Sequence, residues 1–504
     1  MRIIYIDIDS CRPDHLGCYG YDRETSPNID RIAAEGVVFE NCYCSDAPCM
    51  PSRTAFYSGR LGIQTGVVGH GGTAAYPKGE GATRGFRDRF EEDGLAGRLQ
   101  SIGLRTAMIS PFGQRHAAHW FYAGFNEVYN TGGGGEESAE EIWPVLDDWI
   151  DRNGASEDWY LHVNFWDPHT PYRVPVGVAN TYEDNPLPAW LEDPQALEKH
   201  RSMVGPHGAN ELNMYDDEVR EGFPRSLGKI ETSEDLKSVI DNYDLGIRHV
   251  DQYIGKLVEK LRSLGIYEEV AIIISADHGE NLGELGIYSE HATADEATCH
   301  IPMIVKWPSG NRGVDKRLCY GIDMSATFLG LLGIERPKSW DGVSMADAVV
   351  DAHNRNAERR ELVVSQCAHV CQRSVRWDTW LYIRTYHDGF HLFPEEMLFD
   401  LENDPHEQED LSSIQIERCR EGAWRLAQWH AGQMGTMARR GGDLVDPLWS
   451  VIAEGGPFHA RLRSPGRPGR EGFLAFLRRL EASGREDGAR VLREKYREEL
   501  EKWA

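Results

Sequence analysis

The chain has 504 residues, of which 40% are hydrophobic and 27% are charged, and its formal net charge is −27. This length is too great for one ordinary hydrophobic core, so we expect at least two subdomains. The negative charge disfavours binding to nucleic acids and to anionic membrane surfaces, and no segment has the apolar length of a membrane-spanning helix.

The chain starts with a pattern typical of a buried strand, over residues 2–8. A signal peptide needs a cationic start, a longer apolar stretch and a cleavage site of small residues, and this pattern is absent. The ten cysteines are scattered, and Cys42 and Cys44 are too close together for the usual zinc pair. We therefore expect a cytoplasmic protein with free thiols.

Strand-length apolar runs alternate with helical patterns through the first two-thirds of the chain. The expected strands cover residues 2–8, 37–43, 104–109, 159–165, 270–275 and 302–307. The expected helices cover residues 27–35, a stretch after Cys49, and residues 93–102, 136–152, 234–264 and 323–332. This alternation predicts an α/β fold with a largely parallel central sheet and helices on both faces.

The pattern changes towards the C-terminus. Residues 170–232 are rich in proline, glycine and acidic side chains and predict long loops. Short antiparallel strands follow, and then helices over residues 410–434 and 473–503. We expect an α/β domain over residues 1–345 and a smaller α+β subdomain with a short antiparallel sheet over residues 346–504. The last helix alternates basic and acidic residues, so we expect it to face solvent or a second copy in a homo-oligomer.

The most informative segment runs from Cys49 to Arg53 and reads Cys-Met-Pro-Ser-Arg. Pro51 suits the first turn of a helix. Cys49 would then lie at a helix N-terminus, where backbone N–H groups favour an anion and lower the pKa of a thiol. Arg53, one turn further on, can direct its guanidinium at the same point. The alternative is a buried and inert cysteine.

Polar residues follow three of the expected strands. Asp9, His169 and Asp277 each come shortly after a buried apolar run. Ligands of open α/β sheets bind beyond the carboxyl ends of the strands. We therefore expect these three residues to meet at one edge of the sheet.

Together, these segments resemble the signatures of the type I sulfatases, which belong to the alkaline-phosphatase-like superfamily. Cys49 begins a match to Cys-x-Pro-Ser-Arg, and Asp9 begins a stretch similar to Asp-Asp-x-Arg-Pro-Asp. Asp277 and His278 lie in a stretch that resembles Ser-Asp-His-Gly-Glu-x-Leu-Gly, and His169 lies in one that resembles Pro-His-x-Pro-Phe/Tyr.

The resemblance implies that a formylglycine-generating enzyme oxidises Cys49 to formylglycine, whose hydrate is the nucleophile. It also implies that Asp9, Asp277 and His278 hold one divalent ion. Ca²⁺ is the first candidate, and Mg²⁺ is an alternative that also suits hard oxygen ligands. A histidine and one fewer carboxylate move the site towards Mn²⁺. Arg53 is expected to stabilise the charge of the transferred group.

The resemblance makes His169 the candidate for protonating the leaving oxygen. His70, His116 and His291 are candidates for binding the sulfate, and ordinary surface or loop histidines are the alternative for them. A small sulfated substrate, either an aryl or a carbohydrate sulfate, is the expected partner.

The chain departs from the family pattern in three places. Ser10 stands where a second aspartate is common, and Asp7 could compensate or could be only a buried, hydrogen-bonded residue. Glu290 stands where a lysine is usual, and the Gly-Lys-Trp-His motif after residues 104–109 is absent, so that Arg115 or His116 would have to supply its charge.

These departures keep two alternatives to a sulfate ester hydrolase open. One is a phosphonate monoester or phosphodiester hydrolase of the same superfamily. The other is a non-catalytic protein that binds sulfated glycans and retains an unmodified Cys49.

Overall fold

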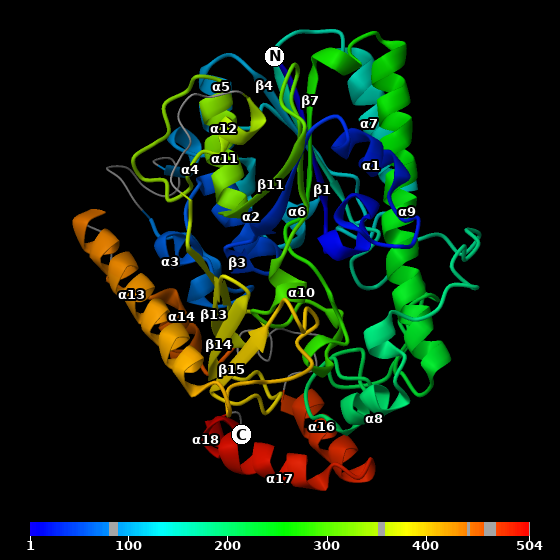
Figure 1. The fold of residues 1–504 in the computed structure, drawn as a ribbon, viewed down its shortest axis with the longest axis vertical. Helices are drawn as coiled ribbons and strands as arrows, with labels where there is room; N and C mark the ends of the chain where they lie inside the picture. The colour runs from blue at the N-terminus through cyan, green and yellow to red at the C-terminus, as the bar shows by residue number, and fades with distance from the viewer. Residues whose placement is uncertain (80–88, 351–357, 441–443, 458–469, 503–504) are drawn as a thin grey trace.

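The computed structural model describes residues 1–79, 89–350, 358–440, 444–457 and 470–502. An eight-stranded sheet forms its centre (Figure 1). In spatial order its strands are β11 (Gly313–Tyr320), β2 (Val37–Tyr43), β10 (Met303–Lys306), β7 (Val270–Ser275), β1 (Arg2–Ile8), β6 (Trp159–Phe165), β4 (Arg105–Ile109) and β5 (Glu127–Tyr129). Only β10 runs antiparallel to its neighbours among these described strands, which confirms the largely parallel sheet.

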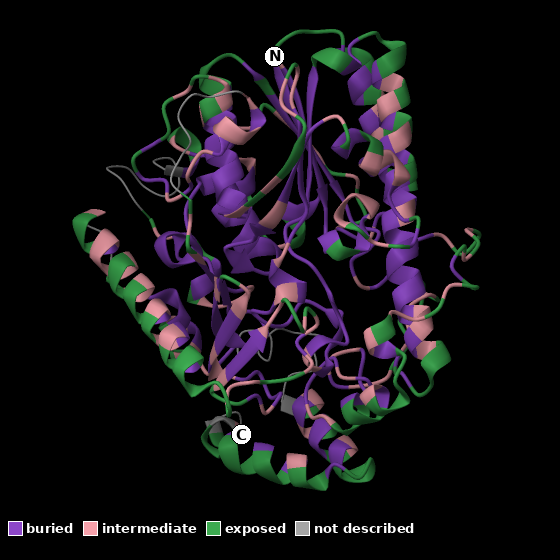
Figure 2. Cartoon of the chain, in the orientation of Figure 1, coloured by how far each residue is buried: buried purple, intermediate pink, exposed green. Residues whose placement is uncertain are grey.

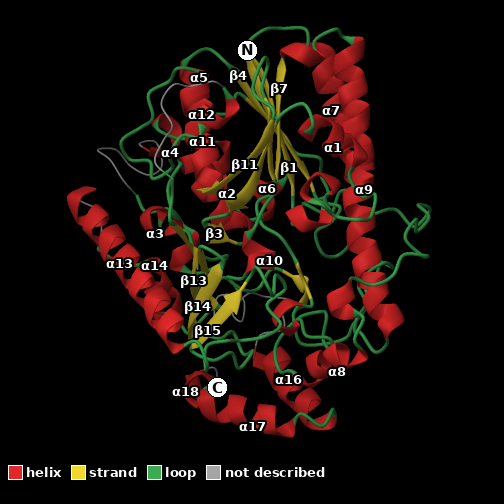
Figure 3. Ribbon diagram, in the orientation of Figure 1, coloured by secondary structure: helices red, strands yellow, loops and turns green. Residues whose placement is uncertain are grey.

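Helices cover both faces of this sheet (Figures 1 and 3). On one face lie α1 (Pro27–Ala33), α7 (Ala139–Asn153) and α9 (Ser233–Ser263), and on the other lie α2 (Cys49–Ser58), α5 (Leu95–Ser101) and α11 (Gly321–Leu331). The central strands β7, β1 and β6 are buried along their whole length, as parallel strands between two helical layers must be.

Helix α9 illustrates how the sequence sets the bounds of an element. Thr232 caps its N-terminus by accepting a hydrogen bond from the Asp235 N–H, and the Asp235 carboxylate accepts one from the Thr232 N–H in return. Towards its two ends the helix buries an apolar stripe and leaves its other face exposed, whereas residues 239–247 in its middle are buried on all sides (Figure 2).

A second sheet has the order β15-β14-β13-β12-β3. Its strands are β12 (Glu361–Gln366), β13 (Cys371–Trp377), β14 (Trp380–His387), β15 (Glu396–Asp400) and β3 (Asp46–Ala47), and α13 (Ile416–Arg440) packs against it. Strands β12 to β15 are antiparallel, as expected, and β3 pairs with β12 in parallel. Because β3 directly precedes α2, this sheet is joined to the start of that helix. The domain boundary at residue 345 stays a prediction.

The remaining described elements are short. They include α3 (Gly62–Thr65), α4 (Arg89–Glu92), α6 (Phe112–Arg115), α8 (Pro194–Ser202), α10 (Glu296–Cys299), α12 (Ala346–Val349), α14 (Pro447–Ala453) and a pair formed by β8 (Asn281–Leu282) and β9 (Tyr288–Glu290). Residues 170–232 are mostly loop, as expected. In the described ranges, every helix is too short or too polar to span a lipid bilayer.

The C-terminal end differs from its prediction. In place of one helix over residues 473–503, the described part contains α16 (Arg470–Ala482), α17 (Glu486–Lys495) and α18 (Arg497–Lys502), and residue 503 lies outside it. Gly484, at φ +78°, allows the turn between α16 and α17. The apolar faces of α16 and α17 pack on the chain itself, whereas most of their charged residues are exposed to solvent as expected. Contact of these helices with a second copy stays a prediction. Their buried side chains are Phe473, Phe476, Leu477, Leu480, Ala489 and Leu492.

Candidate active site

Three adjacent strands of the central sheet converge on one site. Strand β1 lies between β7 and β6, and Asp9, Asp277 and His169 follow the carboxyl ends of these strands. Asp9 Oδ1 lies 3.8 Å from His169 Nε2 and 3.7 Å from His278 Nε2. The structure thus brings together the residues that the strand-end rule predicted.

Cys49 is the first residue of α2 and is 3% exposed. Its Sγ atom lies 3.3 Å from His70 Nε2 and 3.9 Å from His116 Nε2, so two of the three histidines proposed for sulfate binding flank it. The Ser52 hydroxyl donates a hydrogen bond of 2.6 Å to the Asp277 carbonyl. This bond ties the first turn of α2 to the end of β7.

The prediction of a lowered thiol pKa at Cys49 is wrong for the unmodified residue. Burial raises the pKa well above its usual value, and the carboxylates of Asp9 and Asp277 raise it further. A helix N-terminus contributes about 0.3–2 kcal/mol, roughly one pKa unit. Burial can shift a pKa by about 3–5 units and therefore outweighs it.

The donor atoms of Asp9, Asp277 and His278 fit a cation. His278 Nδ1 lies 2.8 Å from the Gly279 carbonyl, so in the neutral ring this nitrogen carries the hydrogen and Nε2 carries a lone pair. Asp277 Oδ2 lies 3.4 Å from that Nε2. Asp9 Oδ1 and His278 Nε2 are buried and make no hydrogen bond. Buried acceptors that face one another in this way need a positive charge between them.

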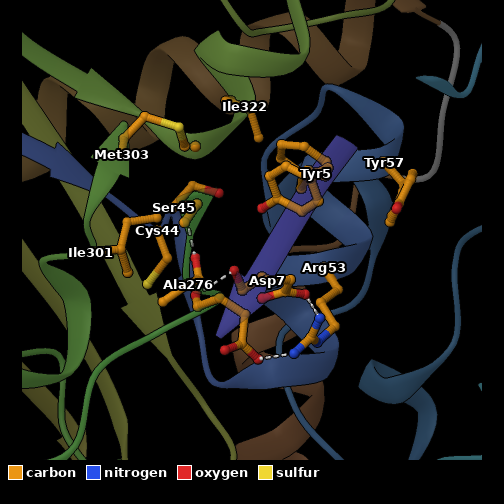
Figure 4. Close-up of a pocket in the computed structure, with 15 residues that line it drawn as sticks. Tyr5, Asp7, Cys44, Ser45, Arg53, Tyr57, Ala276, Ile301, Met303 and Ile322 are labelled. Atoms are coloured by element: carbon orange, nitrogen blue, oxygen red, sulfur yellow. Dashed lines mark hydrogen bonds and ion pairs between the residues drawn. The ribbon is translucent and has the colours of Figure 1, made fainter. Parts of the chain in front are cut away.

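Arg53 points into this carboxylate cluster rather than at the Cys49 thiol, which differs from the predicted direction. Its Nη2 lies 2.8 Å from Asp9 Oδ2 and 3.1 Å from Asp277 Oδ2. Its Nη1 contacts Asp7 (Figure 4). Asp7 also lies 3.1 Å from His162 Nε2, so it is a buried and paired carboxylate. Behind Arg53 lies a closed cavity of about 20 Å³, large enough for about one water molecule.

Ser10 acts through its backbone. Its φ of 62° places it in the left-handed region, and its N–H lies 3.4 Å from Asp277 Oδ1. The His278 N–H donates to the same oxygen at 3.0 Å. Burial raises the pKa of Asp277, but the nearby Arg53 guanidinium outweighs burial and brings that pKa below its usual value.

His169 and His291 differ in charge although their rings lie only 5.1 Å apart. Burial, together with the nearby Arg173, lowers the pKa of His169 well below its usual value. Burial also disfavours charge on His291, but Glu290 and Glu280 raise its pKa to about 10. Burial and Arg173 thus disfavour the charged form of His169, whereas the two carboxylates favour the charged form of His291 beside it.

A cleft of about 720 Å³ opens in front of Cys49. It is lined by all four histidines proposed to act on the substrate, by aromatic rings that include Trp120 and Trp166, and by further polar residues, namely Arg115, Glu136, Thr170, Arg220, Glu290 and His369. The Arg115 guanidinium lies over the Trp166 ring, 5.5 Å from its centroid, and lines the cleft. That Arg115 replaces the charge of the missing lysine stays a prediction.

Two residues in and behind this cleft were not predicted from the sequence. Arg173 is buried and donates to the carbonyls of Trp166 and Gly135, which fixes the loop of His169. His369 lines the cleft from the turn between β12 and β13. Arg173 could have been found because it directly follows the Pro-His-x-Pro-Tyr stretch. His369 gives no local signal.

Sequence comparisons agree with this geometry. The sulfatase family profile matches residues 2–334, and that of the N-sulphoglucosamine sulphohydrolase C-terminal region matches residues 283–419. An arylsulfatase of Clostridium perfringens is 26% identical over 81% of this chain and 90% of its own length. A choline-sulfatase of Rhizobium meliloti is 24% identical over 77% of each chain.

Solved structures share the fold. A 2-O GAG sulfatase superposes with a TM-score of 0.64 at 18% identity, over 88% of this chain and 93% of its own. The phosphonate monoester hydrolase of Agrobacterium radiobacter gives 0.64 at 16% identity, over 86% and 96%. Because the sulfatase profile spans well over half of the sequence, this chain belongs to the sulfatase family and is a sulfuric ester hydrolase.

Proposed function

We propose that the chain hydrolyses a small aryl or carbohydrate sulfate monoester through a formylglycine made from Cys49 by a formylglycine-generating enzyme. The position of Cys49 is the observation that carries this proposal. The residue opens helix α2 at the base of the cleft, with His70 and His116 beside it. The hydrated aldehyde would place a hydroxyl where the thiol Sγ now lies.

We propose that Asp9, Asp277 and His278 hold one divalent ion, with Ca²⁺ as the first candidate and Mn²⁺ or Mg²⁺ as alternatives. Their buried acceptor atoms support this assignment. When bound, such an ion polarises the ester oxygens and neutralises developing charge. Arg53 orients Asp9 and Asp277 and offsets their charge.

His169 is the proposed general acid. Its Nδ1 contacts the Thr170 carbonyl, which leaves Nε2 facing Asp9 and the cleft. An anionic substrate in the cleft favours the protonated imidazole, so on substrate binding His169 would take up a proton from solvent at Nε2 and then donate it to the leaving oxygen. The cationic His291, with His70 and His116, would bind the ester oxygens.

Phosphonate monoester or phosphodiester hydrolysis is the second candidate. The similar fold of the Agrobacterium enzyme and the Ser10 departure favour it. Comparing kcat/KM on an aryl sulfate and on a phenyl phosphonate ester tests the choice. We expect the sulfate to react faster, and a clear preference for the phosphonate would reverse the assignment. A glycan-binding protein without activity would bind sulfated sugar, turn over neither ester and keep an unmodified Cys49.

Metal removal tests the proposed ligands. Treatment with a chelator should abolish hydrolysis, and added Ca²⁺ should restore it. Asp9→Ala and Asp277→Ala should each lower the Ca²⁺ content measured by mass spectrometry, because removing an anionic ligand leaves the ion under-neutralised. Full activity of metal-free protein would contradict this site.

We also propose that the enzyme is cytoplasmic. All ten cysteines lie in the described ranges and all are free, which fits a reducing compartment. Cell fractionation would test this proposal.

A further inference from the structure

Three side chains from distant segments meet beside the cleft, and none of them is a proposed ligand of the first metal ion. His207 comes from the loop after α8, Glu290 ends β9, and His369 lies between β12 and β13. All three are buried, and one donor atom of each lies within 4.8 Å of the other two. Glu290 and His369 also line the cleft, so an ion can reach them from solvent.

The distances match a coordination polyhedron. His207 Nε2 lies 3.2 Å from Glu290 Oε2, and His369 Nε2 lies 3.6 Å from Glu290 Oε1. Ligands at about 2.1 Å from a tetrahedral ion are about 3.4 Å apart. The observed separations lie on either side of that value.

His207 is oriented as a metal-binding histidine is. Its Nδ1 lies 3.1 Å from the Leu212 carbonyl, which assigns the hydrogen to Nδ1 in the neutral ring and turns the Nε2 lone pair towards Glu290. Its backbone is also fixed, since its N–H donates to the Met214 carbonyl and its carbonyl accepts from Tyr288 N–H. The residue is held at φ 55°, a conformation that is uncommon outside glycine.

The Glu290 carboxylate lies among three imidazoles. Its Oε2 is 3.2 Å from His207 Nε2, and its Oε1 is 3.0 Å from His291 Nε2 and 3.6 Å from His369 Nε2. In the neutral ring of His207 the Nε2 lone pair faces this carboxylate, so a cation between the two acceptors would stabilise the contact.

We propose that His207, Glu290 and His369 form a second metal site, which takes a divalent first-row transition ion such as Zn²⁺. Two imidazoles and one carboxylate suit such ions, whereas Ca²⁺ prefers a shell made of oxygen ligands. The bound ion would cross-link the loop after α8, β9 and the second sheet. The proposal does not require the reaction proposed at Cys49, although Glu290 also favours the charged form of His291.

The test counts two kinds of ion in the folded full-length chain. Cys49→Ala serves as the background, because the Cys49 thiol could otherwise bind the probe, and excess Ca²⁺ fills the site of Asp9 and Asp277. Co²⁺ is then added and counted by mass spectrometry, and its visible absorption reports the ligand geometry. We expect one tightly bound Co²⁺ per chain in addition to Ca²⁺.

Glu290→Gln and His369→Gln should each weaken Co²⁺ binding at least tenfold while Ca²⁺ binding is unchanged. His200→Gln is the matched control, since His200 is a buried histidine bonded to the Tyr288 hydroxyl outside the cluster, and it should bind Co²⁺ normally. Co²⁺ binding that is absent from the folded background protein, or unaltered in both variants, would overturn the proposal.

A crystal of the wild-type chain soaked in Zn²⁺ gives a second measurement that needs no variant. The anomalous difference map should show a peak between the three side chains, and an empty position there would also overturn the site. Loss of Ca²⁺ with the Zn²⁺ peak retained would instead count against the function proposed at Cys49.

Discussion

Cys49 differs from other buried cysteines of the chain in its neighbours. Cys11 and Cys371 lie among apolar side chains, whereas the Cys49 thiol lies beside His70 and His116 at the base of an open cleft. The burial-raised pKa keeps this thiol protonated, so it is a poor nucleophile as synthesised. An oxidised residue at this position would remove that obstacle.

We predict that peptide mass spectrometry finds an aldehyde or its hydrate at position 49 when a formylglycine-generating enzyme is coexpressed. Cys371 should remain a thiol in the same sample. Activity should follow the converted fraction, and Cys49→Ala should lower kcat by more than about a thousandfold, as loss of other nucleophiles does. Full activity in protein that carries only a thiol at position 49 would refute the mechanism.

The role of His169 can be separated from simple positioning. If it protonates the leaving oxygen, His169→Ala should slow the hydrolysis of alkyl or sugar sulfates by about 10²–10⁴-fold. Activated aryl sulfates, which leave readily as anions, should be affected far less. A plot of log kcat/KM against leaving-group pKa measures this difference. Equal losses on both substrate types would move the acid to His70, His116 or His291.

At the scale of secondary structure, the buried parallel strands were predictable. The expected bounds of 2–8, 37–43, 159–165 and 270–275 match β1, β2, β6 and β7 because a strand covered on both faces is a continuous apolar run. Strand β11 was missed, since its polar and half-exposed segment has no such pattern. Strand β3 was missed because two residues carry no periodicity.

The candidate site, like the fold, could be predicted from the sequence only in part. Asp9, His169 and Asp277 follow strands that the sequence predicts. The rule that ligands bind at the carboxyl ends of parallel strands therefore placed them together. Glu290 and His369 belong to a short strand and a turn, and only the packing of the turn between β12 and β13 against β9 brings them close. The direction of Arg53 also depends on packing, because one helix turn can point it at the thiol or at the carboxylates.

A buried ion pair at the 3₁₀ turn Glu284–Gly286 makes the stability of the fold depend on pH. Burial raises the pKa of the Glu284 carboxyl, but Arg12 at 2.9 Å and His406 at 3.1 Å outweigh this and bring it from 4.5 to about 2. A lowered folded-state pKa stabilises the fold above the unfolded value of 4.5. That contribution is lost as the pH falls from 4.5 towards 2.

We therefore predict that the wild-type chain loses about 3 kcal/mol from this group over that acid range. Glu284→Gln should be less stable at neutral pH and should lose less stability between pH 4.5 and 2. Urea unfolding at a series of pH values measures both. As a control, Glu486→Gln changes an exposed carboxylate in the first turn of α17 and should leave the acid profile unaltered. Parallel profiles for wild type and Glu284→Gln would contradict the assignment.

At the scale of the whole molecule, the C-terminal helices act on a distant loop. Arg485, at the start of α17, forms a buried ion pair with Glu211, and Arg479 of α16 lies 3.2 Å from the same carboxylate. Phe473 and Phe476 pack on Tyr215 of the same loop. This loop also carries His207. The last helices therefore hold the wall of the cleft although they lie outside it.

The last prediction follows from that arrangement. Arg485→Met removes a positive charge beside the fully buried Glu211 carboxylate. Removing one partner of a buried ion pair costs about 3–5 kcal/mol of folding stability. Since the damage is local, hydrogen exchange should quicken in residues 203–217 while the strands of the central sheet keep their protection. Arg490→Met is the matched control, because its pair with Asp487 is exposed and such pairs contribute about 1 kcal/mol or less. If exchange in the loop is equal in the two variants, the C-terminal helices do not hold it. If protection is lost equally in the central sheet, the helices support the whole fold rather than this wall.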